Sequence, residues 1–269
     1  MPAAVSADMT DVEARLFDSH AHMDDPRFDG DREAVIAAMR SRGVLCVCVG
    51  SNMQTSRAAV ALAEEHEGLW AAAAVHPHDA KEFRDSDLHQ LREWMALPDV
   101  VALGEIGLDY YYDLSPREVQ REVFAHQLEL AAELDMPAIL HIRDAHGDVT
   151  DMLRARRGKL PPFVVHCYSG SWESAKQYMD MGAVVSLAGP VTFKKAVHLQ
   201  EVARKLPAER LLIETDSPYL APEPVRGRRN DPRNVAHVAA FVAALRGVPE
   251  PELAALTLRN ALRFYRIGQ

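Results

Sequence analysis

The chain has 269 residues, of which 48% are hydrophobic and 26% charged, a composition typical of a globular protein with ample apolar material for a core. Its formal net charge of −9 argues against a protein that coats duplex nucleic acid, because that mode of binding requires clustered Lys and Arg. The three cysteines are an odd number, which indicates a reducing compartment and no disulfide framework.

Short apolar runs alternate with helical patterns along the chain. Leu16 and Phe17 open a strand that runs to His22, and apolar residues at helical spacing over 29–42 follow it. Further strands are expected at 44–49, 69–75, 100–105, 138–141, 163–167, 183–187 and 211–215. Further helices are expected at 52–66, 85–97, 116–134, 149–156, 172–181, 194–206, 234–245 and 251–265.

The apolar runs lack alternating polar residues, which indicates strands that are buried on both faces and joined by helical crossovers. Eight such units are the number that closes a parallel barrel. We therefore predict an α/β fold, a single (β/α)8 TIM barrel, as one domain over residues 1–269. A doubly wound open sheet is the structural alternative, but the phosphate fingerprint Gly-x-Gly-x-x-Gly is missing after the first strand.

Side chains that can bind metal end five of the predicted strands. Residues two apart on a strand point the same way, so His20 and His22 can reach a single point. Four more such residues end other strands, namely Glu105, His141, His166 and Asp216. In a barrel the carboxyl ends of the strands converge on one mouth, where catalysis takes place. Each histidine alone is more often structural than a ligand, but their common position favours a metal site.

Four imidazoles and two carboxylates are more than one tetrahedral ion needs, so two divalent ions are expected. Two-metal sites suit the hydrolysis of phosphate esters and of some amides. Glu105 is a natural bridge between the ions, because the glycines at 104 and 107 let neighbouring groups approach it closely.

Seven motifs occur in order along nearly the whole chain. They are DSHAHMD (18–24), AVHPHDA (74–80), GEIGLDYYYD (104–113), HIRDA (141–145), HCYSG (166–170), ETDSPYLAP (214–222) and RRNDPRN (228–234). This set resembles the TatD-type metal-dependent deoxyribonucleases, a family of amidohydrolase-like barrel hydrolases. The chain departs from that family at Asp231, where a Glu is more usual, and the shorter side chain affects only what that carboxylate orients.

The resemblance implies a metal-dependent hydrolase barrel that cleaves nucleic acid with Mg²⁺, or with another divalent ion such as Mn²⁺ or Zn²⁺. The implied ligands are His20, His22 and Asp216 for one ion, His141 and His166 for the other, and Glu105 as the bridge. Asp216, if it also contacts the attacking water, is the predicted general base, so that Asp216 and Glu105 are the expected catalytic carboxylates.

Substrate binding is expected from polar residues around the mouth. The candidates for phosphate contacts are His76, His78, Arg143, Arg228 and Arg229, and the two histidines are also candidates for the ligand shell of the metal. The alternative for the histidines is that they simply lie on the loop after a strand. The alternative for Arg228 and Arg229 is that they are ordinary solvated surface residues. The tyrosines at 110–112, with Tyr168 and Trp172, could stack on nucleobases or simply pack over the barrel rim.

The leading hypothesis is a divalent-metal-dependent deoxyribonuclease acting on single-stranded DNA or on ends, since an acidic protein with a recessed mouth is poorly built to wrap a duplex. One alternative is an amide or lactone hydrolase of the same superfamily, but many of these bridge their ions with a modified Lys, and no Lys lies near Glu105. The other alternative is a non-catalytic binding module. Such a module would be expected to lack one or more metal ligands, and none is missing here. We expect no membrane segment, no obligate protein partner, no signal peptide over 1–13 and a cytoplasmic location.

Overall fold

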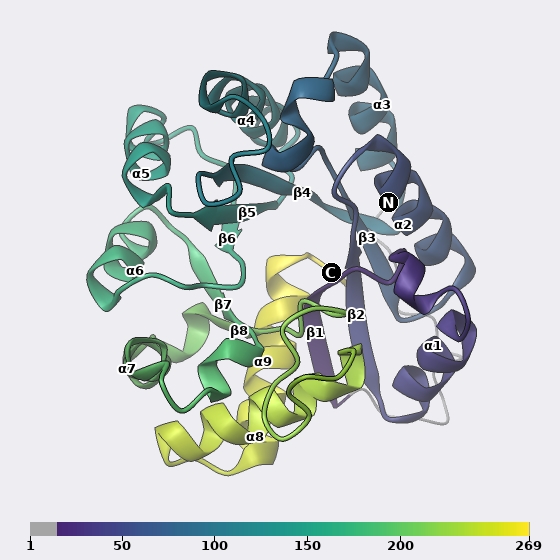
Figure 1. Cartoon of the computed structure of the whole chain (residues 1–269), viewed down its shortest axis with the longest axis vertical. Coiled ribbons are helices and arrows are strands. Elements are labelled where there is room, and N and C mark those ends of the chain that lie inside the picture. Colours follow the sequence, from purple (N-terminus) through teal and green to yellow (C-terminus); the bar gives the residue numbers. More distant parts are fainter. Residues whose placement is uncertain (1–14, 269) are drawn as a thin grey trace.

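Eight parallel strands form one sheet in chain order, in a computed structural model that describes residues 15–268 (Figure 1). The strands are β1 (Leu16–Ala21), β2 (Val44–Val49), β3 (Leu69–Ala73), β4 (Val100–Asp109), β5 (Ala138–Arg143), β6 (Phe163–Val165), β7 (Val184–Leu187) and β8 (Leu211–Ile213). A parallel bridge between Ala21 and Ser217 joins β1 to the segment after β8. The sheet therefore curls into a nearly closed barrel, and the predicted (β/α)8 fold is confirmed.

Helices surround the barrel, one after each of β1 to β7 and two after β8, as the periodicity predicted (Figure 1). They are α1 (Arg32–Ser41), α2 (Met53–Glu65), α3 (Asp85–Met95), α4 (Arg117–Glu133), α5 (His146–Ala155), α6 (Trp172–Met179), α7 (Val197–Lys205), α8 (Val235–Arg246) and α9 (Glu250–Phe264). No helix in the range 15–268 is long and apolar enough to cross a membrane. The expectation of no signal peptide concerns residues 1–13, which lie outside the described residues. The one-domain prediction for 1–269 also includes residues outside 15–268 at both ends.

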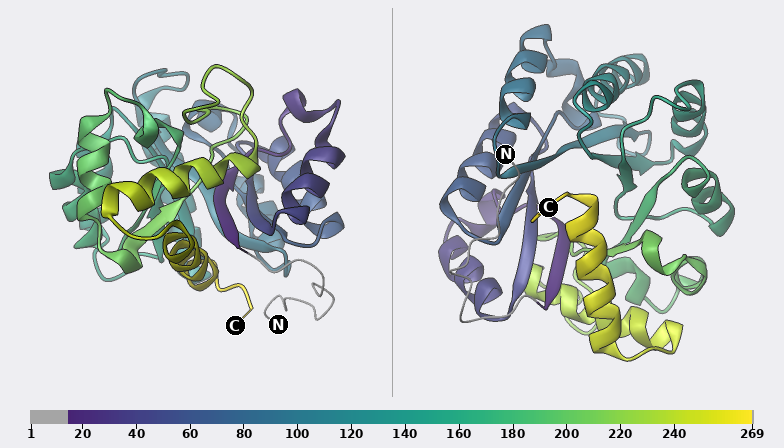
Figure 2. Two further views of the ribbon diagram at one scale, coloured as in Figure 1. Left: turned by 90° about the horizontal axis from the view of Figure 1, so that it is seen from below. Right: turned by 180° about the vertical axis from the view of Figure 1, so that it is seen from behind.

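The interior of the barrel is a separate apolar cluster near the amino ends of the strands. Phe17 stacks there between Trp70 and Tyr265, with ring centroids 5.9 and 6.0 Å away. Tyr265 follows α9 and donates a hydrogen bond of 2.8 Å to the carbonyl of Ser19. In the right-hand view of Figure 2, α9 lies across this end of the barrel. This end is therefore closed by packing, which leaves the carboxyl ends of the strands for chemistry.

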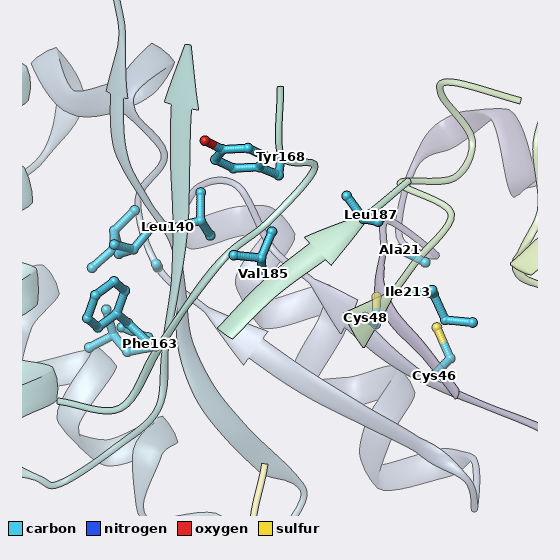
Figure 3. Close-up of a cluster of buried hydrophobic side chains, with 14 of the residues drawn as sticks. Ala21, Cys46, Cys48, Leu140, Phe163, Tyr168, Val185, Leu187 and Ile213 are labelled. Atoms are coloured by element: carbon cyan, nitrogen blue, oxygen red, sulfur yellow. The ribbon is translucent and has the colours of Figure 1, made fainter. Parts of the chain in front are cut away.

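A larger apolar layer lies between the strands and the helices. Cys46 and Cys48 are fully buried in it, among side chains such as Ala21 and Ile213 (Figure 3). Both cysteines are free thiols. Their two-residue spacing therefore reflects the alternation of β2, in which both side chains point outward into the apolar layer and pack as small hydrophobic groups.

The fourth strand is longer than the sequence predicted. We expected it to end at Glu105, but β4 continues through Asp109 by pairing with β5. The pairing register shifts between Gly104 and Ile106, which leaves Glu105 as an extra residue in a β-bulge. The prediction that the strand ends at Glu105 was wrong, because this residue forms a bulge inside the strand and the pairing with β5 continues beyond it.

Candidate metal centre

Two bulges aim side chains into the mouth of the barrel. Glu105 is the unpaired residue of the β4 bulge, and a second register shift in β1, between Asp18 and Ala21, includes His20. A bulge breaks the strict in-and-out alternation and re-aims a side chain, and bulges are frequent beside active sites. Both side chains are almost completely buried, with exposed fractions of 3% for Glu105 and 0% for His20.

The glycines beside Glu105 are required by close packing against β5. A Cβ on Gly107 would lie 2.0 Å from the carbonyl oxygen of His141, and its φ of 147° is one that other residues rarely adopt. A Cβ on Gly104 would lie 2.5 Å from the Cβ of Ile139. The sequence prediction that these glycines permit close approach is thus confirmed, and at Gly107 the group that approaches is the backbone of a candidate ligand.

The carboxylate of Glu105 faces a different set of imidazoles with each oxygen. Its Oε1 lies 2.5 Å from Nε2 of His166 and 2.7 Å from Nδ1 of His141. Its Oε2 lies 3.5 Å from Nε2 of His20 and 4.0 Å from Nε2 of His22. One buried side chain therefore links the two groups of histidines that the sequence analysis separated.

The first group is completed by Asp216. Its Oδ1 lies 3.4 Å from Nε2 of His22 and 3.8 Å from Nε2 of His20, and these two Nε2 atoms are 3.3 Å apart. The structure thus confirms that the His-x-His pair reaches a single point. Asp216 has a φ of 56°, and its backbone N–H donates to the carbonyl of His20 at 2.9 Å. Such left-handed backbone in a residue other than glycine is concentrated at functional sites.

The second group holds one histidine more than expected. Nε2 of His76 lies 3.6 Å from Oε1 of Glu105, so this residue, predicted as a phosphate contact, lies beside the carboxylate with His141 and His166. Ligand atoms of His76, Glu105 and His141 lie within 4.8 Å of one another, as do those of His20, His22 and Glu105. His76 is thus a further candidate ligand, which matches the ligand-shell role that the sequence left open beside a phosphate contact.

The electrostatics of the centre favour a cation. Burial acts to raise the pKa of Glu105, but His166 and His76 hold it well below its usual range, so the carboxylate is ionised. Burial acts to lower the pKa of His22, but Asp216 and Glu105 raise it to about 9. Burial lowers the pKa of His76 to about 3, which keeps its imidazole in the neutral form that binds metals. The raised pKa of His22 reflects the same negative charge, and a divalent cation bound between these carboxylates would take the place of its proton.

Asp109 is a buried carboxylate that the sequence analysis quoted in a motif but gave no role. Its Oδ2 accepts hydrogen bonds from Nε2 of His78 at 2.9 Å and from Nε2 of His141 at 3.1 Å. Its Oδ1 accepts the backbone N–H groups of Tyr111 at 3.0 Å and Tyr112 at 2.8 Å. Burial acts to raise the pKa of Asp109, but His141 and His78 keep it well below its usual range. Asp109 therefore fixes a candidate ligand and the following turn together.

Glu214 is a second buried carboxylate without a predicted role. Its Oε1 accepts the backbone N–H of Cys167 at 2.6 Å and lies 3.3 Å from Nδ1 of His166. Carboxylates in this position orient histidine ligands. Asp18 does not orient the ring of His20 in this way, because its Oδ1 accepts the backbone N–H of His20, at 3.3 Å.

The remaining predicted substrate-binding residues lie around the mouth and differ in their exposure and in their partners. His78 is partly exposed and bonded to Asp109, and Arg143 lies over the rings of Tyr111 and Tyr112. Arg228 is exposed on the loop after β8. Arg229 is paired with both carboxylate oxygens of Asp31 at 2.7 and 2.6 Å, so much of its charge is neutralised. The structure thus brings His78 and Arg143 close to the centre and engages Arg229 elsewhere.

A barrel with this centre matches one family over almost its whole length. The model of the family described as TatD related DNase covers residues 17–266. The chain belongs to this family. The resemblance drawn from the motifs is confirmed.

Individual TatD relatives agree with the family match. The chain is 42% identical to an uncharacterized metal-dependent hydrolase, YabD, of Bacillus subtilis, over 94% of this chain and 100% of that protein. It is 37% identical to a 3'-5' ssDNA/RNA exonuclease TatD of Cronobacter sakazakii, over 93% and 97% of the two chains. The crystal structure of the TatD homolog YJJV from Escherichia coli superposes with a TM-score of 0.88 at 34% identity, covering 94% and 99%. The expected enzyme class, a metal-dependent hydrolase, is therefore confirmed.

Proposed function

We propose that this TatD-family protein hydrolyses phosphodiester bonds of DNA at a two-metal centre, acting on single strands or on ends. The observation that carries the proposal is the placement of Glu105, whose Oε1 faces His141 and His166 while its Oε2 faces His20 and His22. A carboxylate with a different pair of imidazoles nearest each oxygen is suited to bridging two ions, and His166 also lies within 4.8 Å of the ligand atoms of His20 and Asp216.

The residues would divide between the ions as the motifs imply. His20, His22 and Asp216 would hold one ion, and His141 and His166 the other, with His76 near enough to join the second group. When bound, divalent ions at such a centre activate a water and neutralise the charge that develops on a phosphate. The mixed nitrogen and oxygen ligands suit Mn²⁺ and Zn²⁺ as well as Mg²⁺.

Asp216 is the best placed residue to handle the proton of the attacking water. Its side chain is 14% exposed, so it can be reached from the mouth. Burial acts to raise the pKa of Asp216, but the hydrogen bond from His22 holds it below its usual value and keeps the carboxylate ionised. An ionised carboxylate at this position can orient a water and accept its proton.

The loops at the mouth support a nucleic acid substrate. Arginine side chains lie over aromatic rings there, with Arg143 at 4.0 Å from the ring centre of Tyr111 and Arg226 at 4.1 Å from that of Phe193. Positive charge interleaved with aromatic rings is the pattern of single-strand binding surfaces. The names of the family and of the Cronobacter relative give the same class of substrate.

A labelled oligonucleotide assay tests the proposal. The purified protein is incubated with single-stranded DNA and with a blunt duplex of the same sequence, in Mg²⁺, Mn²⁺, Zn²⁺ or chelator, with the Asp216→Asn variant as the control for contaminating nucleases. We expect metal-dependent shortening of the single strand that the variant lacks. Turnover of an amide or lactone panel, with no cleavage of DNA in any ion, would overturn the proposal in favour of the other hydrolase class.

A further inference from the structure

Exposed apolar side chains gather at the mouth of the barrel. Within residues 15–268, the large apolar side chains that are exposed are Tyr111, Tyr112, Leu114, Val197, Tyr219 and Leu220. Each lies between the end of a strand and the first residue of the helix that follows, which is the end of the barrel that holds the metal centre. Tyr111 and Tyr112 are adjacent and exposed by 58% and 54%. Clustered exposed aromatic rings are typical of binding surfaces.

The two rings are held by the same side chain that orients a candidate ligand. Oδ1 of Asp109 accepts the backbone N–H groups of Tyr111 and Tyr112, while Oδ2 accepts a hydrogen bond from His141. The ring of Tyr112 also lies edge-on to that of His78, at 5.4 Å between centroids. The tyrosine turn is therefore fixed beside the metal centre, so a group on these rings would be next to the reacting phosphate.

Arg143 adds a positive charge to the pair. Its guanidinium carbon lies 4.0 Å from the ring centre of Tyr111 and 4.7 Å from that of Tyr112. In the described part of the chain no carboxylate forms an ion pair with Arg143, whereas Arg27 is paired with Asp25 at 2.7 Å. The charge of Arg143 is thus available to an incoming anion, and a guanidinium binds phosphate oxygens in a bidentate manner.

We propose that Tyr111 and Tyr112 stack against a nucleobase next to the phosphate that is hydrolysed, and that Arg143 binds an adjoining phosphate. The proposal rests on the proposed nuclease function and deepens it. A base can lie on these rings only when it is not paired and stacked within a duplex, so the subsite accounts for a preference for single strands or frayed ends. Stacking tolerates every base, because each has a π-face, and predicts little dependence on sequence.

Kinetics on a matched pair of substrates test the stacking contact. One substrate is a single-stranded oligonucleotide, and the other has the same backbone with abasic nucleotides at both ends. The variants are the double substitutions Tyr111→Ala with Tyr112→Ala and Tyr111→Phe with Tyr112→Phe. Leu114→Ala is the control, because it removes an exposed apolar side chain from the same loop.

We expect the alanine pair to lower kcat/KM on the intact strand by about 5- to 150-fold, the range for one stacked base, and to change cleavage of the abasic strand little. The phenylalanine pair keeps the ring faces and should behave as the wild type, as should Leu114→Ala. Equal losses on both substrates, or no loss on either, would overturn the stacking subsite while leaving the nuclease function standing.

A binding measurement distinguishes the case in which the stacking proposal is wrong from the case in which the proposed nuclease function is wrong. Fluorescence anisotropy with the same two oligonucleotides and chelator-treated protein measures affinity without turnover. Tyrosine-dependent binding without cleavage in any divalent ion would retain the subsite and overturn the nuclease. Arg143→Gln should reduce the slope of log affinity against log salt by about 0.7, the value for one phosphate contact on a single strand, whereas Arg157→Gln, an exposed arginine after α5, should not. An unchanged slope for Arg143→Gln would overturn its phosphate contact.

Discussion

Asp18 and Thr215 are joined by two hydrogen bonds across the seam where the first and last strands of the barrel meet. Oδ1 of Asp18 accepts the backbone N–H of Thr215 at 2.8 Å, and Oδ2 accepts its hydroxyl at 2.5 Å. Both residues are fully buried. This contact contributes to closure of the barrel together with the bridge between Ala21 and Ser217 and the hydrogen bond from the N–H of Asp216 to the carbonyl of His20. It also sets the relative position of two candidate ligands, because His20 lies two residues after Asp18 and Asp216 directly follows Thr215.

Replacement of Thr215 by Val should therefore destabilise the barrel. The change keeps the shape of the side chain but removes the hydroxyl from a buried carboxylate, so we expect the free energy of unfolding to fall by about 1–3 kcal/mol. Urea unfolding measures this. Thr257→Val is the matched control, because Thr257 is equally buried but bonds only to carbonyls of its own helix, Leu253 and Ala254. Equal losses in the two variants would mean that the seam contact contributes nothing beyond an ordinary buried hydroxyl.

Substitution of Asp216 by Asn should separate folding from chemistry. The amide keeps the size of the side chain but cannot accept a proton, so we expect an unchanged unfolding midpoint and a fall in kcat of about 10²- to 10⁴-fold, the usual range for loss of a general base. Asp151→Asn on the outer helix α5 is the control, since that carboxylate is 82% exposed. Near-wild-type hydrolysis of single-stranded DNA by Asp216→Asn would remove Asp216 from the mechanism.

The sequence predicted the parts of the centre that depend on local periodicity. The two-residue spacing predicted that His20 and His22 reach one point, which holds although β1 has a register shift around His20 and ends at Ala21. Apolar runs ending in His166 and Asp216 predicted that these residues lie at the mouth. The bulge at Glu105 could not be predicted, because it is defined by pairing with β5, about thirty residues away in the chain. The role of Asp109 was missed for the same reason, since its partners His78 and His141 are brought to it by neighbouring strands.

Replacement of single histidines should reveal how the ions divide between the residues. His20→Ala should weaken one ion and leave the other bound, because His141 and His166 keep their contacts with Oε1 of Glu105. His166→Ala should weaken the opposite ion. Metal content after dialysis against a fixed free concentration of Mn²⁺, measured by mass spectrometry, gives the stoichiometry, which we expect to fall from two to one in each variant. Loss of both ions from either variant would show that the centre assembles as a unit.

Glu214 should act on the metal through His166. The change Glu214→Gln keeps an oxygen that can accept the N–H of Cys167, which lies 2.6 Å from Oε1 of Glu214. It removes the negative charge of this oxygen, which lies 3.3 Å from Nδ1 of His166. Loss of such an orienting carboxylate typically lowers metal affinity by 10- to 100-fold, and calorimetric titration with Mn²⁺ measures the change. Thermal unfolding in chelator is the control, because a purely structural role would lower stability in the absence of metal and leave the affinity of the folded protein unchanged. If the affinity for Mn²⁺ equals that of the wild type, the role of Glu214 is only to hold the backbone of Cys167.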